Sequence, residues 1–186
     1  MRLRPQIVIL NGIGSVGKSS TAKALQAIAS KPFLHVAMDA FLTMLPEKML
    51  AHADGLTLTS SQHEGRPIVT VGSGPVLECA MRGMRHAVAA MAAQGNNLIV
   101  DEVMIGPQKP QEYRNLLQSF DLYLVGLIAP LDVLETRERA RGDRMIGLAR
   151  GQYGLVHRGI TYDLEVDTSA ATPTECARKI SDVLGL

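Results

Sequence analysis

A glycine-rich segment near the start of the chain has the residue types and the spacing of a phosphate-binding loop. Residues 12–19 read Gly-Ile-Gly-Ser-Val-Gly-Lys-Ser and match G-x-x-x-x-G-K-[ST], for which the composition predicts roughly 0.005 accidental matches. The glycines let the backbone wrap a phosphate group, so that successive N–H groups and the start of the next helix face the anion. In this pattern Lys18 reaches the β- and γ-phosphates, and the hydroxyl of Ser19 binds Mg²⁺. The residues expected to contact the nucleotide are Gly12, Gly14, Ser15, Val16, Gly17, Lys18, Ser19 and Ser20.

An acidic residue ends an apolar run in the middle of the chain. The run 97–100 reads Asn-Leu-Ile-Val and is followed by Asp101 and Glu102. An acid at the end of such a strand can orient Mg²⁺, directly or through water. We therefore expect Ser19 and Asp101 to hold the metal, with Glu102 as a weaker candidate. Because apolar strands often end in Asp, the alternative is that Asp101 only caps the next turn.

Asp39 follows a second apolar run, in the sequence Val-Ala-Met-Asp-Ala-Phe. In an open α/β sheet, ligands bind outside the carboxyl ends of the strands. A carboxylate at that place, beside the phosphate-binding loop, can accept the proton of an acceptor hydroxyl. The alternative is structural, because Asp is also a good N-cap for the helix that is expected to follow.

A basic segment lies in the second half of the chain. Arg137, Arg141 and Arg144 are spaced so that one face of a helix could present all three. Glycines flank the segment, and in a phosphoryl-transfer enzyme such a segment is typical of a lid that closes over the γ-phosphate and excludes water. The alternative is a solvated helix face with local salt bridges to Glu138 and Asp143.

Helical and strand-like segments alternate along the chain, which is typical of a parallel sheet with crossover helices. The patterns predict strands over 6–10, 33–38, 97–101, 122–128 and 164–167. They predict helices over 18–29, 40–51, 75–93, 111–119, 131–141 and 173–184. We expect one domain over residues 1–186, with a three-layer α/β P-loop kinase fold whose central parallel sheet has about five strands flanked by helices. The strand ending at Leu10 should be central, with those ending at Met38 and Val100 on one side of it.

Two segments stand outside this alternation. The stretch of about 53–74 is rich in glycine and has β-forming residues at 56–59 and 68–71, which predicts a small inserted hairpin. The stretch of about 141–157 is the predicted lid. We expect the hairpin and the methionine-containing helix after it to form part of the pocket for the acceptor.

The composition excludes several classes of protein. Nineteen Lys and Arg against eighteen Asp and Glu leave a net charge of +1, and aromatic residues make up only 4%, so neither nucleic acid nor a membrane is an expected partner. Two cysteines are too few for a disulfide scaffold, and the five histidines lack metal-ligand spacing. No apolar run has the length of a membrane helix, and none fits a signal peptide, so we expect a soluble cytoplasmic protein. The sequence leaves open whether the chain forms a homo-oligomer.

Together these motifs resemble those of the chloramphenicol phosphotransferase family of P-loop kinases, over about residues 7–178. The more specific parts are Arg-Gly-Asp-Arg at 141–144 and Tyr-Asp-Leu-Glu-Val-Asp-Thr at 162–168. In that family, ATP phosphorylates the primary hydroxyl of chloramphenicol and so inactivates the antibiotic. The resemblance implies that Asp39 is the general base and that Lys18 is the P-loop lysine. The lid arginines that it implies are Arg137, Arg141 and Arg144.

We therefore expect an enzyme that uses ATP and Mg²⁺ to phosphorylate a hydroxyl of a small organic acceptor. The similarity is weakest over 54–74, so a kinase of an unknown hydroxylated metabolite is an alternative, and a non-enzymatic nucleotide-binding protein is another. A nucleoside monophosphate kinase is disfavoured, because no second phosphate-binding cluster lies outside the lid. A guanine-nucleotide switch would need an N-K-x-D motif, which the chain lacks. We expect the nucleotide base to lie against 168–173.

Overall fold

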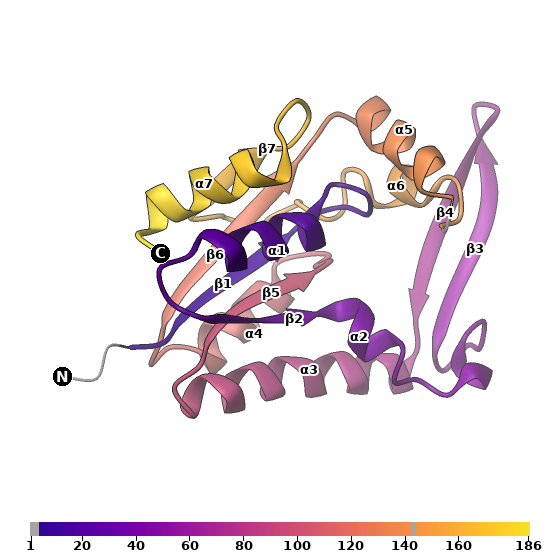
Figure 1. Ribbon diagram of the computed structural model, residues 1–186. Coiled ribbons are helices and arrows are strands. Elements are labelled where there is room, and N and C mark those ends of the chain that lie inside the picture. Colours follow the sequence, from indigo (N-terminus) through magenta and orange to yellow (C-terminus); the bar gives the residue numbers. More distant parts are fainter. Residues whose placement is uncertain (1–3, 143) are drawn as a thin grey trace.

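A parallel five-stranded sheet forms the centre of the computed structural model, which describes residues 4–142 and 144–186 (Figure 1). Its strand order is β2-β5-β1-β6-β7. These strands are β1 (Gln6–Asn11), β2 (Phe33–Ala37), β5 (Asn97–Glu102), β6 (Asp121–Ile128) and β7 (Leu164–Asp167). The predicted sheet is confirmed, with β1 central and both β5 and β2 on one side of it. Asp143, which the sequence offers as a salt-bridge partner, lies outside the described residues.

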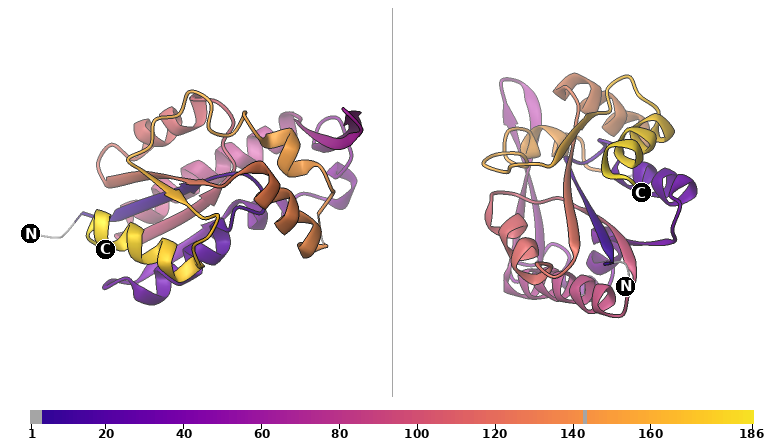
Figure 2. Two further views of the ribbon diagram at one scale, coloured as in Figure 1. Left: turned by 90° about the horizontal axis from the view of Figure 1, so that it is seen from above. Right: turned by 90° about the vertical axis from the view of Figure 1, so that its left-hand side faces the viewer.

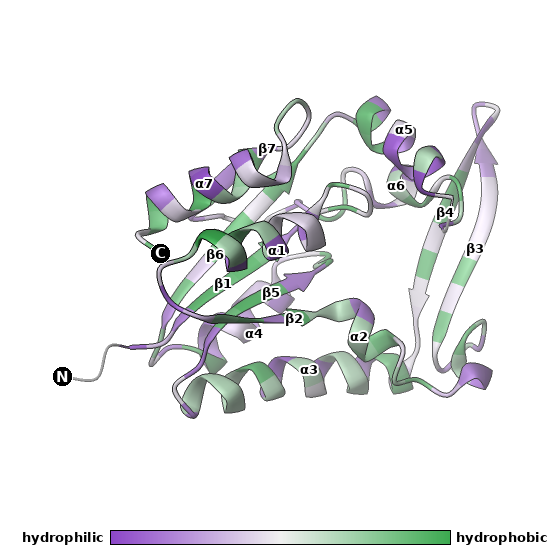
Figure 3. Ribbon diagram, viewed as in Figure 1, coloured by the Kyte–Doolittle hydropathy of each residue, from purple (hydrophilic) through white to green (hydrophobic). Residues whose placement is uncertain are grey.

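Strand β1 is central because both of its faces are apolar and every one of its residues is buried. Ile7 and Ile9 point into one hydrophobic cluster, while Val8 and Leu10 point into a second cluster on the opposite face. Figure 3 shows hydrophobic colour along the inner strands of the sheet.

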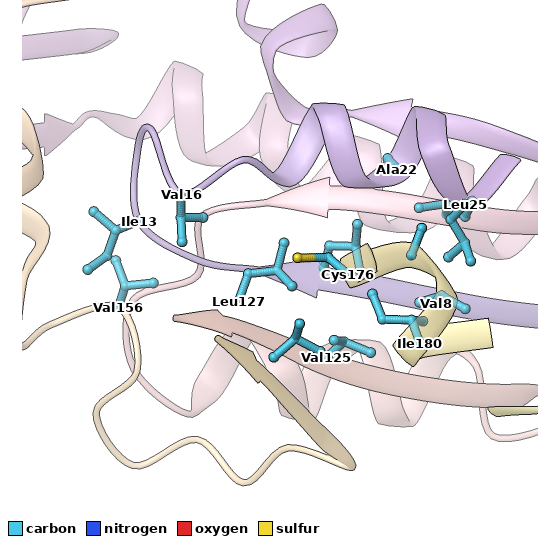
Figure 4. Packing of buried hydrophobic residues seen from close by; sticks show 14 of the residues in the cluster. Val8, Ile13, Val16, Ala22, Leu25, Val125, Leu127, Val156, Cys176 and Ile180 are labelled. Carbon is cyan, nitrogen blue, oxygen red and sulfur yellow. The ribbon is translucent and has the colours of Figure 1, made fainter. Parts of the chain in front are cut away.

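Helices cover both faces of the sheet and complete the three layers (Figure 2). On one face, α1 (Lys18–Ile28) and α7 (Pro173–Leu184) contribute Ala22, Leu25, Cys176 and Ile180 to the core, and Figure 4 shows these side chains meeting those of β1 and β6. On the other face lie α3 (Pro75–Ala93) and α4 (Gln108–Leu116). None of the helices in the described part of the chain is long and apolar enough to cross a membrane.

The prediction of one helix over 40–51 is wrong. The chain forms a short helix, α2 (Met38–Leu42), and then a single 3₁₀ turn, η1 (Glu47–Met49). Pro46 explains the break, because proline has no backbone N–H to donate and disfavours the helical conformation in the residue before it. Helix α4 also begins three residues before the predicted start, with Pro110 tolerated in its first turn.

The inserted hairpin is confirmed and is longer than the sequence predicts. Strands β3 (Leu56–His63) and β4 (Arg66–Ser73) pair antiparallel along their whole length, beside the main sheet (Figure 1). The turn between them consists of Glu64 and Gly65, which both have positive φ angles, of 51° and 72°. Two consecutive residues of this kind match the twist of a tight hairpin.

The predicted lid is packed against this hairpin. It contains α6 (Leu148–Gln152), which follows α5 (Leu131–Arg141). The buried carboxylate of Glu138 on α5 accepts hydrogen bonds from the backbone N–H groups of Gly147 and Ala149, at 2.8 and 2.7 Å. The carbonyl oxygen of Gly147 in turn accepts from the N–H of Val69 on β4, at 2.9 Å. The hairpin, α5 and α6 therefore form one connected unit at the carboxyl ends of the strands.

Gly151 is the position at which this packing can be tested. A Cβ atom added there would collide with the carbonyl oxygen of Val69, although its backbone is ordinary helix. We expect Gly151→Ala to lower the free energy of unfolding by about 1–3 kcal/mol because the crowded backbones must separate. Urea unfolding followed by circular dichroism measures the change.

The matched control is Gly83→Ala on the exposed side of α3, where an added Cβ meets no atom within 4 Å. That substitution should raise the free energy of unfolding by about 0.5–1 kcal/mol, because alanine restricts the unfolded chain more than glycine does. If both substitutions stabilised the protein, the close packing of α6 on β4 would be contradicted.

Candidate active site

The phosphate-binding loop joins the end of β1 to the start of α1. A Cβ atom on Gly12 would lie 2.8 Å from the carbonyl oxygen of Leu127, so only glycine fits there without movement. Gly17 directly precedes α1 and has a φ of +98°, which also favours glycine. The first helical residue is Lys18, as the pattern requires.

The side chain of Lys18 is buried in its own loop. Its Nζ donates hydrogen bonds to the carbonyl oxygens of Gly12 and Ile13, at 2.8 and 3.1 Å. Burial lowers the pKa of this ammonium group to about 8, an effect that the negative charge of Asp101 opposes. A buried ammonium group held only by carbonyl oxygens is well placed to exchange these partners for phosphate oxygens.

Ser19 and Asp101 meet although they are far apart in the sequence. Leu10 is the register partner of Asp101 in the pairing of β1 with β5, and the Ser19 hydroxyl donates to Asp101 Oδ2 at 2.5 Å. The imidazole Nε2 of His35, on β2, lies 3.6 Å from the same oxygen. Burial raises the pKa of Asp101, but the His35 side chain, the Lys18 charge and the Ser19 hydroxyl outweigh it and lower the pKa overall. Asp101 is therefore a carboxylate at neutral pH.

Ser19 and Asp101 together fit a magnesium ion that is bound partly by the protein and partly by the phosphates of a nucleotide. A hydroxyl and a carboxylate are the hard oxygen donors that Mg²⁺ prefers, and in nucleotide sites Mg²⁺ takes its remaining ligands from phosphate and water. Within the described ranges, no three His, Cys, Asp or Glu side chains are grouped so that they could hold a metal ion by themselves. A metal ion at Ser19 and Asp101 would therefore need ligands from the nucleotide and from water.

The structure places Glu102 away from this site. Consecutive strand residues point to opposite faces of a sheet, so Glu102 faces α3 and α4 while Asp101 faces the loop. Its carboxylate accepts a hydrogen bond from the Tyr113 hydroxyl at 2.6 Å and lies 3.5 Å from Arg85 Nη1. Burial raises the pKa of Glu102. Glu102 therefore links β5 to α3 and α4 through buried polar contacts.

Asn11 fixes the end of β1, where the loop begins. Its amide donates to the Tyr162 hydroxyl at 2.6 Å and to the carbonyl oxygen of Val156 at 3.2 Å. Its Oδ1 accepts from the backbone N–H of Met104 at 2.7 Å. One side chain thus ties β1 to the segments that follow β5 and α6.

Asp39 lies at the mouth of the phosphate-binding loop. Its alternative role as an N-cap is wrong, because Ala37 occupies the cap position of α2 and no side chain caps this helix. The Asp39 carboxylate instead accepts a hydrogen bond from Arg144 Nη2 at 3.1 Å. Asp39, Lys18, Asp101 and Arg144 all line one small cavity of about 60 Å³, which we call the transfer cavity.

The three predicted lid arginines divide between two places. Arg141 and Arg144 line the transfer cavity. Arg137 turns away and donates to the hydroxyl and the carbonyl oxygen of Thr168, at 3.1 and 2.6 Å. The Thr168 hydroxyl donates in turn to the carbonyl oxygen of Val16 in the loop, at 2.9 Å. The three side chains therefore do not share one site, because α5 ends at Arg141 and the helical spacing stops there.

Arg137 belongs to a second cavity, of about 300 Å³, which we call the base cavity. It lies between the phosphate-binding loop and the start of α7, and Arg141 reaches its edge. Thr168, Ala171 and Pro173 line it, and these residues belong to the 168–173 segment that the sequence analysis predicts to contact the nucleotide base.

A larger space with mostly apolar walls adjoins the transfer cavity, and we call it the acceptor cavity. It has an inner lobe of about 400 Å³ that contains Asp39 and Arg144, and an outer lobe of about 340 Å³ that contains Leu77 and Met81 of α3. The hairpin lines both lobes through Leu56 and Val71. The insert and the helix after it thus line this cavity, and they are the elements that the sequence analysis predicts to form part of the acceptor pocket. The residues that line both lobes are Met38, Leu42, Leu56, Val71, Val103 and Gln152.

Two polar residues of the site are missed by the sequence analysis. His35, whose Nε2 lies 3.6 Å from Asp101 Oδ2, enters that analysis only as one of five histidines without metal-ligand spacing. Gln152, whose Oε1 accepts a hydrogen bond from the backbone N–H of Gly14 at 2.8 Å, belongs to no motif. Only the folding of α6 over the loop brings it there, and no local pattern signals that contact.

Comparison with solved structures supports the kinase fold. A sugar kinase from Janibacter sp. superposes with a TM-score of 0.68 at 16% identity, over 97% of this chain and 95% of that one. The Mycobacterium tuberculosis APS kinase CysC, in complex with AMPPNP and APS, gives a TM-score of 0.67 at 16% identity over 99% of each chain. The tunicamycin resistance protein of Deinococcus radiodurans gives 0.65 at 19% identity, over 98% of this chain and 97% of that one.

Comparison of sequences identifies the family. A Mycobacterium tuberculosis protein named Putative O-phosphotransferase is 31% identical over 182 residues, which cover 95% of this chain and 81% of that protein. Residues 5–185 match the family described as Chloramphenicol phosphotransferase-like protein. The chain therefore belongs to the chloramphenicol phosphotransferase-like family, on the evidence of nearly its whole length.

Proposed function

We propose that this protein transfers the γ-phosphoryl group of ATP to a hydroxyl of a small, largely apolar acceptor, with Mg²⁺ as cofactor. The observation that carries this proposal is the position of Asp39, which lines both the transfer cavity and the inner lobe of the acceptor cavity. A hydroxyl in that lobe would face the phosphate-binding loop with a carboxylate beside it. This arrangement favours an enzyme over a protein that only binds nucleotide.

In this proposal the nucleotide lies across the loop. The base occupies the base cavity near Arg137, and the phosphates follow the loop to the transfer cavity. The Lys18 ammonium group exchanges its hydrogen bonds to the carbonyl oxygens of Gly12 and Ile13 for hydrogen bonds to phosphate oxygens. Ser19 and Asp101 hold Mg²⁺, which when bound neutralises phosphate charge.

The chemistry is a single displacement at phosphorus. The acceptor oxygen forms a bond to the γ-phosphorus while the bond from that phosphorus to the β,γ-bridging oxygen breaks and ADP leaves. Asp39 accepts the hydroxyl proton, as a general base does when a hydroxyl attacks at neutral pH. Arg144, which here pairs with Asp39, can contact the γ-phosphate from the same place, since both side chains line the transfer cavity. Charge on the moving phosphoryl group is then balanced by Lys18, Arg141 and Arg144.

Chloramphenicol or a chemically similar alcohol is the proposed acceptor, so the protein would inactivate an antibiotic. The family description and the apolar lobes of the acceptor cavity support this choice. A hydroxylated metabolite with an apolar body fits the same walls and is the alternative. A panel of alcohols, incubated with ATP and Mg²⁺ and analysed by mass spectrometry, tests the proposal. Formation of ADP at the same rate with and without every alcohol would contradict it.

Asp39→Asn tests the assignment of the general base. The amide keeps the size of the side chain but cannot accept the proton. We expect kcat for phosphorylation of chloramphenicol to fall by about 10²–10⁴-fold, the usual effect of removing a general base. The dissociation constant for Mg·ADP should stay within about twofold, because Asp39 does not hold the metal in this proposal.

The control for Asp39→Asn is Asp182→Asn, the same chemical change on the exposed side of α7. It should leave kcat unchanged. If Asp39→Asn weakened Mg·ADP binding and spared kcat, Asp39 would be a metal ligand and not the base.

Lys18 predicts a pH dependence of nucleotide binding. With a pKa of about 8, this group is about half protonated at pH 8, and nearby phosphate favours the charged form. Binding of Mg·ADP at pH 8 should therefore take up about half a proton. The uptake should vanish below about pH 7, where the ammonium group is already charged, and nucleotide affinity should fall as the pH rises above 8.

Calorimetry of Mg·ADP binding in two buffers of different ionisation enthalpy measures this uptake. Lys18→Arg should abolish it, because a guanidinium group stays charged throughout this range. Lys23→Arg, on the exposed side of the same helix, is the control and should retain it. Equal uptake in both variants would assign the proton to another group.

A further inference from the structure

Gln152 makes a buried contact with the phosphate-binding loop that the proposed function does not use. Its side-chain oxygen accepts a hydrogen bond from the N–H of Gly14 at 2.8 Å, and the residue is only 8% exposed. A backbone N–H can only donate, so the oxygen of the Gln152 amide must face it. The Nε2 group of the amide must therefore point the other way.

The Nε2 group of Gln152 has unused hydrogen-bonding capacity. It carries two N–H donors, and within residues 4–142 and 144–186 no group accepts from either of them. Nε2 is not one of the fully buried side-chain atoms that lack a partner in the described part of the chain, so it faces the open space of the acceptor cavity, where a ligand oxygen can take the place of water.

Helix α6, which carries Gln152, is held in place at both of its ends. Gln152 is the last residue of α6, and the N-terminus of this helix is held by Glu138 through two hydrogen bonds. Gly151 lets the helix approach the backbone of β4 closely. The amide is thus oriented both by its helix and by the loop, as a specificity residue requires.

The position of Gln152 in the acceptor cavity is distinctive. Six residues line both the inner and the outer lobe, and five of them are apolar: Met38, Leu42, Leu56, Val71 and Val103. Gln152 is the sixth. Among the described residues it is the one polar side chain that lines both lobes, between the lobe that contains Asp39 and the lobe that contains Leu77 and Met81, whose wall also includes Ser73, Glu78 and Lys109.

We propose that Gln152 determines acceptor specificity by donating an Nε2 hydrogen bond to an oxygen of the acceptor, while its Oε1 stays anchored to Gly14. This inference rests on the proposed function. It defines the substrate class more narrowly: an alcohol with its reactive hydroxyl at one end, an apolar body at the other, and a hydroxyl or carbonyl oxygen between them. The anchor to Gly14 also ties the acceptor directly to the loop that holds the phosphates.

The test compares two acceptors in the full-length protein. Chloramphenicol carries a second hydroxyl and an amide carbonyl between its primary hydroxyl and its ring, whereas 3-phenylpropan-1-ol has only methylene groups there. In the unmodified protein kcat/KM should favour chloramphenicol. Gln152→Met, which keeps the length of the side chain without its donors, should lower that preference by about tenfold, the effect of one lost hydrogen bond.

A second variant distinguishes the donor group of the Gln152 amide from its acceptor oxygen. Gln152→Glu keeps an oxygen for the Gly14 N–H but has no donor at neutral pH, so it should lose the same preference. Gln118→Met, on an exposed surface, is the control and should keep the preference of the unmodified protein. Gln118→Met should leave the melting temperature and the dissociation constant for Mg·ADP unchanged, whereas Gln152→Met should also lower the melting temperature, because it removes the acceptor of the Gly14 N–H.

Two contrary outcomes are distinguishable. If Gln152→Met and Gln152→Glu each lowered kcat/KM equally for both alcohols, Gln152 would only support the loop, and this inference would be overturned while the proposed function stood. If the unmodified protein phosphorylated neither alcohol, the proposed acceptor class would be contradicted, and the inference would fall with it.

Discussion

The parallel pairing of β1 with β5 is the constraint on which the site depends. It sets Leu10 beside Asp101, and so brings the residue after the P-loop lysine within hydrogen-bonding distance of the carboxylate. A shift of one residue in either strand would turn Asp101 towards α3 and expose Glu102 to the loop, since strand residues alternate between faces. The complete burial of β1 between two hydrophobic clusters prevents such a shift, because it would reverse the packing of every side chain in the strand.

A second set of contacts holds the acceptor side of the site. Glu138 on α5 orients the start of α6, α6 packs on β4, and Gln152 at its end reaches the loop. The phosphate side is thus built by the central sheet, and the acceptor side by the hairpin and the predicted lid. Arg144 joins the two sides through its ion pair with Asp39. Movement of the basic segment would therefore alter the surroundings of the proposed base.

The sequence predicts most of what depends on local pattern. The phosphate-binding loop, the central place of β1 with β2 and β5 on one side of it, and the hairpin follow from glycine spacing, apolar runs and their alternation, and the structure confirms that fold. The prediction of one helix over 40–51 is wrong because Pro46 interrupts it, although the apolar residues on both sides have helical spacing. The grouping of Arg137 with Arg144 fails because α5 ends between them. Gln152 could not be predicted, since its importance comes from a contact with Gly14 that lies 138 residues away in the sequence.

The hairpin gives the protein a way to change its substrate without changing its chemistry. Leu58 and Val71 face the inner lobe, yet neither belongs to the two clusters that stabilise the sheet. Mutations at such positions can reshape the space for the acceptor at little cost in folding, whereas the loop and Asp101 are fixed by the core. Selectivity and reactivity are thus encoded in separate stretches of one gene, so each can evolve while the other is maintained. In the proposed function, such an enzyme could follow its acceptor through successive chemical modifications.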